Sequence, residues 1–171
     1  MEAVSLWRAL GWGGAIQAVA FDYGGTLDRR DVARGAGGSY PVSATAQQVI
    51  GEVARLGLVL LLATNTTPDQ DRHPALAQAG VAHHFSCLLQ SHQLTTDKPD
   101  AEFFELVHQK AGCPPEAILF VGDNPNHDVH PALEHGMNAV LVAPAAPIDL
   151  PAGAAHITDL AHLPGLLKGT T

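Results

Sequence analysis

The chain has 171 residues, of which 46% are hydrophobic and 15% charged, a composition typical of one compact domain and unlike that of a disordered chain. Its formal net charge is -8 and its 9 Lys and Arg residues form no run, which argues against sequence-independent nucleic-acid binding. No apolar run approaches the ~20 residues of a membrane-spanning helix.

The chain carries neither a signal-peptide pattern at its N-terminus nor a cysteine spacing that is typical of a metal site or a disulfide framework. Cys87 and Cys113 are therefore expected to be reduced, partly buried thiols. Together these features predict a cytoplasmic protein with no membrane partner and no nucleic-acid patch.

Apolar strands alternate with helices along the chain. Strands are expected at residues 16–21, 58–63, 85–89, 118–121 and 138–142. Helices are expected at residues 43–55, 74–79, 98–110, 127–135 and 157–167, the first with Ser43 as its N-cap. Residues 28–42 are charged and rich in Gly, which favours a loop.

This alternation implies right-handed crossovers and a parallel sheet covered by helices on both faces. The expected fold is therefore α/β, a three-layer, doubly wound, Rossmann-like parallel sheet. We expect one domain over residues 1–171, with an N-terminal extension at 1–15 and a C-terminal tail at 143–171 that packs on the core.

Polar residues close the strands, where a doubly wound sheet binds its ligand. Asp22 ends the first strand and is followed by Gly24, Gly25 and Thr26. Such a carboxylate can act as a nucleophile toward phosphorus or carbon while nearby backbone N–H groups hold the oxygens of the substrate.

Three further residues fit the same chemistry. Thr64, at the tip of the second strand, can donate a hydrogen bond to a phosphoryl oxygen, and Lys98 can neutralise developing negative charge. Asp123 and Asp128 bring two more carboxylates to this edge of the sheet. Carboxylates that share a cleft repel one another unless a cation binds them, and an all-oxygen set of ligands favours magnesium over zinc.

Four segments together resemble, in order, the four motifs of the haloacid dehalogenase superfamily of hydrolases. They are Asp22-Tyr23-Gly24-Gly25-Thr26-Leu27, Thr64, Lys98 before Pro99-Asp100, and Gly122-Asp123 with Asp128. The resemblance covers residues 16 to 142 and implies a hydrolase that forms an aspartyl-phosphate at Asp22.

The resemblance also implies roles for the matching residues. Mg²⁺ would be coordinated by Asp22, the backbone carbonyl of Gly24, and Asp123, with Asp128 as a further ligand or an anchor for Lys98 or a water. The substrate would be held by Gly25, Thr26, Thr64, Asn65 and Lys98, with Asp22, Thr64 and Lys98 as the catalytic residues.

Two features depart from the family pattern. Its phosphatases carry a second Asp two residues after the nucleophile, as the acid for the leaving group, and here that residue is Gly24. The intervals of 42 residues from Asp22 to Thr64 and 34 from Thr64 to Lys98 are filled by one helix and one strand each, so no cap domain is expected.

Each candidate residue also has a purely structural explanation. Lys98 can be a charge at a helix entry, Thr64 a capping residue, and Asp128 a favourable charge at a helix N-terminus. The histidines, including the 83–84 and 127–130 groups, lack zinc spacing and are expected at the surface or in the core. Asp28 and Asp31 are expected to be solvated loop charges, with a substitute acid as the alternative. Tyr23 is expected to pack on the face opposite Asp22.

Three functions remain open from the residues. The first is a magnesium-dependent phosphatase, weak on alkyl phosphates, that acts on a phosphorylated small molecule or macromolecule. The second is a non-catalytic module that binds magnesium and a phosphorylated ligand. The third is a dehalogenase or phosphonatase. An open site is also compatible with a homodimer.

Overall fold

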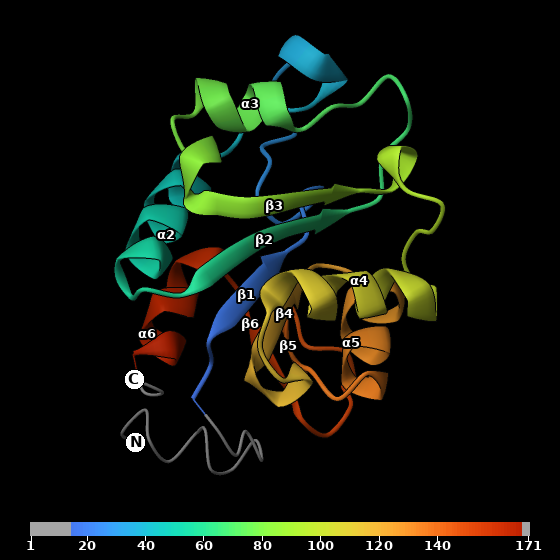
Figure 1. The fold of residues 1–171 in the computed structure, drawn as a ribbon. Coiled ribbons are helices and arrows are strands. Elements are labelled where there is room, and N and C mark those ends of the chain that lie inside the picture. The colour runs from blue at the N-terminus through green and yellow to red at the C-terminus, as the bar shows by residue number, and fades with distance from the viewer. Residues whose placement is uncertain (1–14, 169–171) are drawn as a thin grey trace.

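A computed structural model of the chain describes residues 15–168. Six parallel strands form one sheet in the order β3-β2-β1-β4-β5-β6 (Figure 1). The strands are β1 (Ala18–Phe21), β2 (Val59–Thr64), β3 (Phe85–Gln90), β4 (Ile118–Gly122), β5 (Asn138–Val142) and β6 (Ala154–Ile157). Because β2 and β4 flank β1, the strand order reverses at β1, and a ligand crevice is expected beyond its carboxyl end.

Helices cover both faces of the sheet, which makes three layers. In Figure 1, α2 and α6 lie on one face and α4 and α5 on the other. The helices are α2 (Ala44–Arg55), α3 (His73–Gln78), α4 (Ala101–Ala111), α5 (His130–Glu134) and α6 (Leu163–Leu167). Shorter turns are η1 (Ala36–Gly38), η2 (Ala82–His84), η3 (Ser91–Gln93), η4 (Pro115–Ala117), η5 (Pro125–Val129) and η6 (Leu160–His162).

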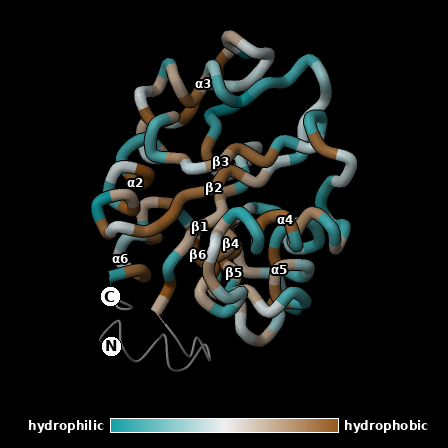
Figure 2. Tube along the Cα trace, in the orientation of Figure 1, coloured by the Kyte–Doolittle hydropathy of each residue, from teal (hydrophilic) through white to brown (hydrophobic). Residues whose placement is uncertain are grey.

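The two faces of β1 explain why these helices pack where they do. Val19 and Phe21 point into a buried cluster that includes Ile50 and Val53 of α2, whereas Ala18 and Ala20 point into the cluster that contains Phe103 and Phe104 of α4. Hydrophobic residues concentrate in the central strands (Figure 2). The alternation of side chains along a strand thus supplies one core to each face.

The α/β fold predicted from the sequence is confirmed, with all five expected strands present. The predicted N-cap is also present, since the Ser43 hydroxyl accepts a hydrogen bond of 3.0 Å from the Ala46 amide. Tyr23 is fully buried in the core cluster, as expected.

Three expected elements differ in the structure. The C-terminal tail contributes a sixth strand, β6, where only a packing helix was expected. The helix expected at 127–135 is a π-helical turn, η5, followed by the short α5. Helix α4 begins at Ala101, after a cis Lys98–Pro99 bond, so Lys98 lies in the preceding loop.

The connections between the first three strands contain short helices and turns. Between β1 and β2 the chain forms η1 and α2, and between β2 and β3 it forms α3 and η2. The expected N-terminal extension at 1–15 lies, apart from residue 15, outside the described residues. Over residues 15–168, no helix is long and apolar enough to cross a membrane. Cys87 and Cys113 are free and partly buried.

Candidate active site

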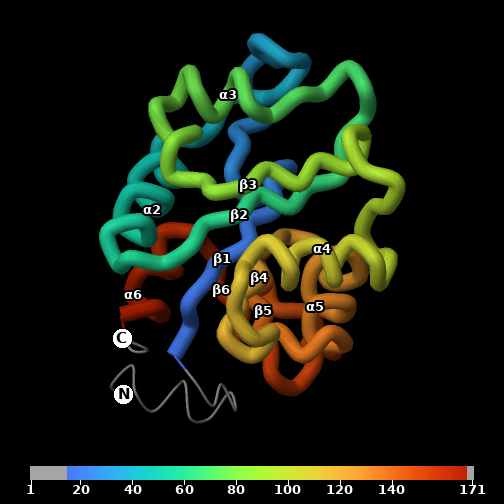
Figure 3. Tube along the Cα trace, in the orientation of Figure 1, coloured from blue at the N-terminus to red at the C-terminus, as the bar shows by residue number. Residues whose placement is uncertain are grey.

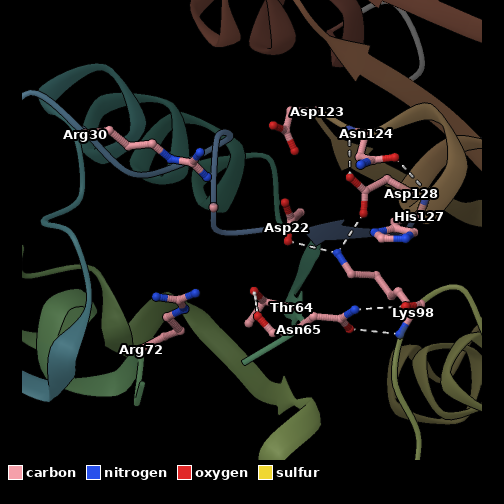
Figure 4. Close-up of a pocket in the computed structure, with 11 residues that line it drawn as sticks. Asp22, Arg30, Thr64, Asn65, Arg72, Lys98, Asp123, Asn124, His127 and Asp128 are labelled. Atoms are coloured by element: carbon pink, nitrogen blue, oxygen red, sulfur yellow. Dashed lines mark hydrogen bonds and ion pairs between the residues drawn. The ribbon is translucent and has the colours of Figure 1, made fainter. Parts of the chain in front are cut away.

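A cavity of about 350 Å³ opens beyond the carboxyl ends of β1, β2 and β4 (Figure 4). Figure 3 follows the connections from β2 to α3 and from β3 to α4, which lie at this same end of the sheet. The cavity is lined by Asp22, Gly24, Arg30, Thr64, Asn65, Arg72, Lys98, Asp123, Asn124, His127 and Asp128. The expected residues that converge on it are thus Asp22, Gly24, Thr64, Asn65, Lys98, Asp123 and Asp128.

Lys98 joins two carboxylates at the floor of this cavity. Its Nζ donates hydrogen bonds of 2.8 Å to Asp22 Oδ1 and 2.6 Å to Asp128 Oδ1 (Figure 4). Lys98 is 4% exposed, and burial by itself would lower the pKa of its ammonium group. The two carboxylates outweigh burial and raise the pKa of Lys98 above its ordinary value, which favours its charged form.

Asn65 positions the loop that carries Lys98. The Asn65 side chain accepts a hydrogen bond of 2.8 Å from the Lys98 amide and donates one of 2.8 Å to the Lys98 carbonyl. Because Asn65 directly follows β2, these two bonds fix the Lys98 backbone to the end of that strand. Thr64 is 1% exposed beside it and its hydroxyl donates to the Asn65 carbonyl at 3.3 Å.

Asp128 is fixed at the opposite side of Lys98 by the turn η5. The Asn124 amide donates a hydrogen bond of 3.0 Å to Asp128 Oδ2, while the Asn124 side chain caps the turn by accepting from the amides of Asn126 and His127. π-helical turns of this kind frequently occur at functional sites. Both oxygens of Asp128 thus have a defined donor.

Three carboxylates gather next to Lys98. Oxygens of Asp22, Asp123 and Asp128 all lie within 4.8 Å of one another. Burial, together with the charges of Asp22 and Asp128, raises the pKa of Asp123 to about 6. One lysine does not balance three acids, so this group has the charge and the oxygen donors that a divalent cation requires.

Two glycines allow the carboxylates to approach the backbone. A Cβ atom at Gly25, which has a φ of +77°, would lie 2.0 Å from Asp123 Oδ2. A Cβ atom at Gly122 would lie 2.2 Å from Asp128 Oδ2. The glycines of the first and fourth motifs therefore leave the space in which the acidic group forms.

Arg30 lies beside the backbone at which the second family Asp would stand. A Cβ atom at Gly24 would lie 3.0 Å from Arg30 Nη2. Arg30 pairs with Asp28 at 3.3 Å, and its side chain is 60% exposed. The site therefore presents a guanidinium where the sequence motif of phosphatases presents a carboxylic acid.

Sequence analysis missed four residues that line the cavity: Arg30, Arg72, Asn124 and His127. Arg30 and Arg72 come from loops whose path the local sequence does not determine. Asn124 could have been found, because Asn before Pro125 is a strong N-cap signal at the end of a predicted strand. His127 is exposed, as expected for a surface histidine, and it also borders the cavity.

Some candidates lie beside the cavity without lining it. The Gly25 amide donates to Asp28 Oδ1 at 2.7 Å, and Thr26 is buried with its hydroxyl unpaired among the described residues. The Asp28 side chain is 2% exposed, so the expectation of a solvated charge was wrong for Asp28: the Gly25 amide and Arg30 bind it. Asp31 is exposed and pairs with Arg29, as a loop charge does.

The comparisons with known proteins identify the family of the chain. The family model for haloacid dehalogenase-like hydrolases matches residues 28–136, more than half of the chain. The chain therefore belongs to the haloacid dehalogenase-like hydrolase family. The matched part begins after the first motif, so it does not include Asp22. The assignment of Asp22 to the site comes from its sequence motif and from its contact with Lys98.

Two curated relatives are phosphatases. A phosphoserine phosphatase of Thermus thermophilus is 42% identical over 103 residues, which cover 60% of this chain and 41% of the relative. A glyceraldehyde 3-phosphate phosphatase of Methanothermobacter thermautotrophicus is 34% identical over 67 residues, 39% of this chain and 30% of the relative. The chain thus spans less than half the length of these relatives.

Solved structures share the fold. An L-2-haloacid dehalogenase from Xanthobacter autotrophicus with chloropropionic acid covalently bound superimposes with a TM-score of 0.75 at 18% identity, over 91% of this chain and 100% of that one. An uncharacterized protein from Listeria monocytogenes gives a TM-score of 0.74 at 20% identity, over 90% and 97% of the two chains. At these identities the likeness concerns the fold alone.

Proposed function

We propose that this protein is a magnesium-dependent phosphomonoester hydrolase in which Asp22 is the nucleophile. The observation that carries the proposal is the contact of Lys98 with both Asp22 and Asp128, 2.8 and 2.6 Å away. This contact lies beyond the carboxyl end of β1, where the strand order reverses. The phosphatase names of the curated relatives support a phosphomonoester as the substrate class.

The chemistry follows from the positions of the side chains. A carboxylate oxygen of Asp22 would attack phosphorus, the bond from phosphorus to the leaving oxygen would break, and water would then hydrolyse the aspartyl-phosphate. Lys98, held by Asn65, would stabilise the negative charge on the phosphoryl oxygens. The Thr64 hydroxyl, at the end of the neighbouring strand, would donate to another of those oxygens.

The residues present fit Mg²⁺. Asp22, Asp123 and the Gly24 carbonyl would hold it, with Asp128 as a further ligand or as the anchor of Lys98. All are oxygen donors. Burial, together with the charges of Asp22 and Asp128, raises the pKa of Asp123, and a bound cation would favour the ionised form. When bound, the ion would neutralise charge on the transferred phosphoryl group.

Gly24 limits the substrates that we propose. General acid catalysis contributes roughly 10²- to 10⁴-fold, and Gly24 supplies no acid to the leaving oxygen. Arg30, beside Gly24, cannot take that role because a guanidinium does not release its proton near neutral pH. We therefore expect hydrolysis of esters with good leaving groups, or of substrates that carry their own acid.

The short connections between the strands favour a capless arrangement, with the cavity open to solvent. Such a site would accept a phosphorylated small molecule or an exposed phosphate on a larger partner. Dimerisation of the chain would be one way to close it. These remain proposals.

Phosphate release from a series of aryl and alkyl phosphates tests the proposal. With Mg²⁺, rates should fall steeply as the pKa of the leaving group rises, and Asp22→Asn should abolish turnover. Arg55→Gln, on the exposed end of α2, is a control that should leave the rates unchanged. A flat dependence on leaving-group pKa would contradict the proposed absence of a general acid.

A binding module is the second candidate, and the replacement of the acid by Gly24 beside Arg30 favours it. In that case neither the wild type nor Asp22→Asn would release phosphate, while inorganic phosphate would still bind in the presence of Mg²⁺. Calorimetric titration with phosphate separates this outcome from an inactive, misfolded protein. Turnover that Asp22→Asn abolishes would exclude binding as the sole role.

A further inference from the structure

Arg72 is a buried cation that the proposed reaction does not use. It is 7% exposed and lines the same cavity as Asp22 and Lys98. Within residues 15–168 no carboxylate forms an ion pair with it, and its Nε–H has no hydrogen-bond acceptor. The nearby charges of Asp28 and Asp22 offset only part of the cost of burying this guanidinium, so an anion bound to it would be favourable.

The contacts of Arg72 hold its side chain in place but include no ion pair. Its guanidinium carbon lies 4.6 Å from the centre of the Tyr23 ring, and its Nη1 donates to Ser39 Oγ at 3.1 Å. Its backbone amide donates to Gln90 at 2.7 Å. These contacts come from three separate segments, so the guanidinium is pre-positioned, as a specific binding site requires.

Arg72 lies on a different side of the cavity from the proposed phosphoryl site. In Figure 4, Arg30 and Arg72 lie on one side of Asp22, and Lys98 and Asp128 lie on the other. Burial lowers the pKa of Arg72 from its ordinary value, but a guanidinium remains charged at neutral pH. Arg30 and Arg72 thus bring two guanidinium groups to the side of the cavity away from Lys98, where Asp28, paired with Arg30, compensates one of the two charges.

From this arrangement we propose that Arg72 binds a second anionic group of the substrate, a carboxylate or a second phosphoryl group. The proposal rests on the proposed function for the position of the scissile phosphoryl group beside Asp22. A planar guanidinium matches two oxygens of such a group, which gives both affinity and orientation. Arg30 lines the same cavity with an exposed guanidinium that is paired with Asp28.

A cavity of about 350 Å³ has the size of a site for a small ligand. The substrate class that follows is a small phosphomonoester with a second negative charge.

The test measures binding, so it does not depend on turnover. Calorimetric titrations with Mg²⁺ present would compare propylphosphonate, which has a neutral tail, with phosphonopropionate and ethylenediphosphonate. The wild type should bind one of the two ligands with an anionic tail about 10- to 100-fold more tightly than propylphosphonate, a range set by charge-assisted hydrogen bonds. The ligand with the larger preference identifies the second group as a carboxylate or a phosphoryl group.

Arg72→Gln should reduce this preference to about one, and Arg72→Lys should keep only part of it, because a lysine lacks the planar pair of donors. Arg55→Gln removes an exposed positive charge outside the cavity and should keep the full preference. A wild-type preference near one would overturn the proposal without any variant. Equal loss of all three ligands in Arg72→Gln would overturn it too, since Arg72 would then bind the first phosphoryl group.

The hydrolysis assay and the binding titrations together show which of the two proposals has failed. If aryl phosphates are not hydrolysed but the Arg72-dependent preference is present, the second anion site stands and the phosphatase proposal fails. If aryl phosphates are hydrolysed through Asp22 but the preference is absent, the phosphatase proposal stands and the Arg72 site fails.

Discussion

A side chain at Gly24 would begin 3.0 Å from Nη2 of Arg30, so the guanidinium of Arg30 borders the place of the missing acid. Gly24 has no left-handed backbone, and the neighbouring atom is the far end of an exposed, flexible side chain. A larger residue at position 24 therefore requires only a shift of Arg30.

Gly24→Asp should restore a general acid. Turnover of alkyl phosphates should rise by about 10- to 100-fold, below the full roughly 10⁴-fold of an optimised acid, because Arg30 would pair with the new carboxylate. Gly24→Asn has the same size without the proton and is the matched control. Steady-state rates on alkyl and aryl phosphates would check this, and an equal gain from both variants would contradict an acid-base origin.

Lys98→Met should weaken both activity and stability. It would leave Asp22 and Asp128 buried without their shared cation, and breaking a buried pair in this way costs about 3–5 kcal/mol. Urea unfolding of the metal-free protein measures this loss. Lys110→Met, on the exposed side of α4, should change stability little.

The cause of that loss can be tested by a second change. Adding Asp128→Asn to Lys98→Met should recover part of the lost stability, because it removes one of the two unpaired charges. No recovery in the double variant would mean that other lost contacts of the lysine dominate, such as that of its Nζ with the Phe120 ring, whose centre is 5.5 Å away.

Asp123→Asn should stabilise the metal-free protein while abolishing its Mg²⁺ binding. The pKa of Asp123 is raised to about 6 in the folded state, so the folded protein holds this proton more tightly than the unfolded chain does. The stability that the proton provides is present below about pH 4 and is lost as the pH rises to about 6. At about pH 7 the variant should be more stable by about 1–2 kcal/mol, a value reduced for the partial exposure of the carboxyl.

Urea unfolding with a chelator at about pH 7 and about pH 4 checks this sign, since the advantage of the variant should disappear at the lower pH. Mg²⁺ should then raise the stability of the wild type but not that of Asp123→Asn. A variant that is less stable than the wild type at both pH values would contradict the proposed repulsion.

Gly122→Ala should disturb the acidic group through Asp128. The added Cβ would lie 2.2 Å from Asp128 Oδ2, the oxygen that accepts from the Asn124 amide. We expect a loss of about 1–3 kcal/mol and lower turnover. Gly51→Ala, inside α2 with no atom within 4 Å of its Cβ, should instead gain about 0.5–1 kcal/mol, and thermal unfolding compares the two.

The amino-acid sequence predicted the sheet and the residues at its carboxyl edge. Runs such as 118–121 are strands because both faces of a parallel sheet are covered, so their side chains are apolar without alternation. Once the strands are known, the parallel direction requires Asp22, Thr64 and Asp123 to meet at one edge. Lys98 could be predicted because the family motif fixes its order in the chain.

Other parts of the fold and the site depend on contacts between distant segments. β6 is a short strand, AAHI, after a segment that contains Pro and Gly, and it forms by pairing with β5. Arg72 follows a loop of polar residues in which nothing indicates burial. Its position depends on Tyr23, Ser39 and Gln90, which are 49, 33 and 18 residues away along the chain.

Strand direction brings Asp22, Thr64 and Asp123 together at one edge of the sheet. Lys98 and Asp128 reach this edge from a loop and a turn, where Asn65 and Asn124 hold them. The two arginines at the other end of the cavity follow from tertiary packing, because a loop side chain takes its direction from the surfaces that the rest of the chain presents to it.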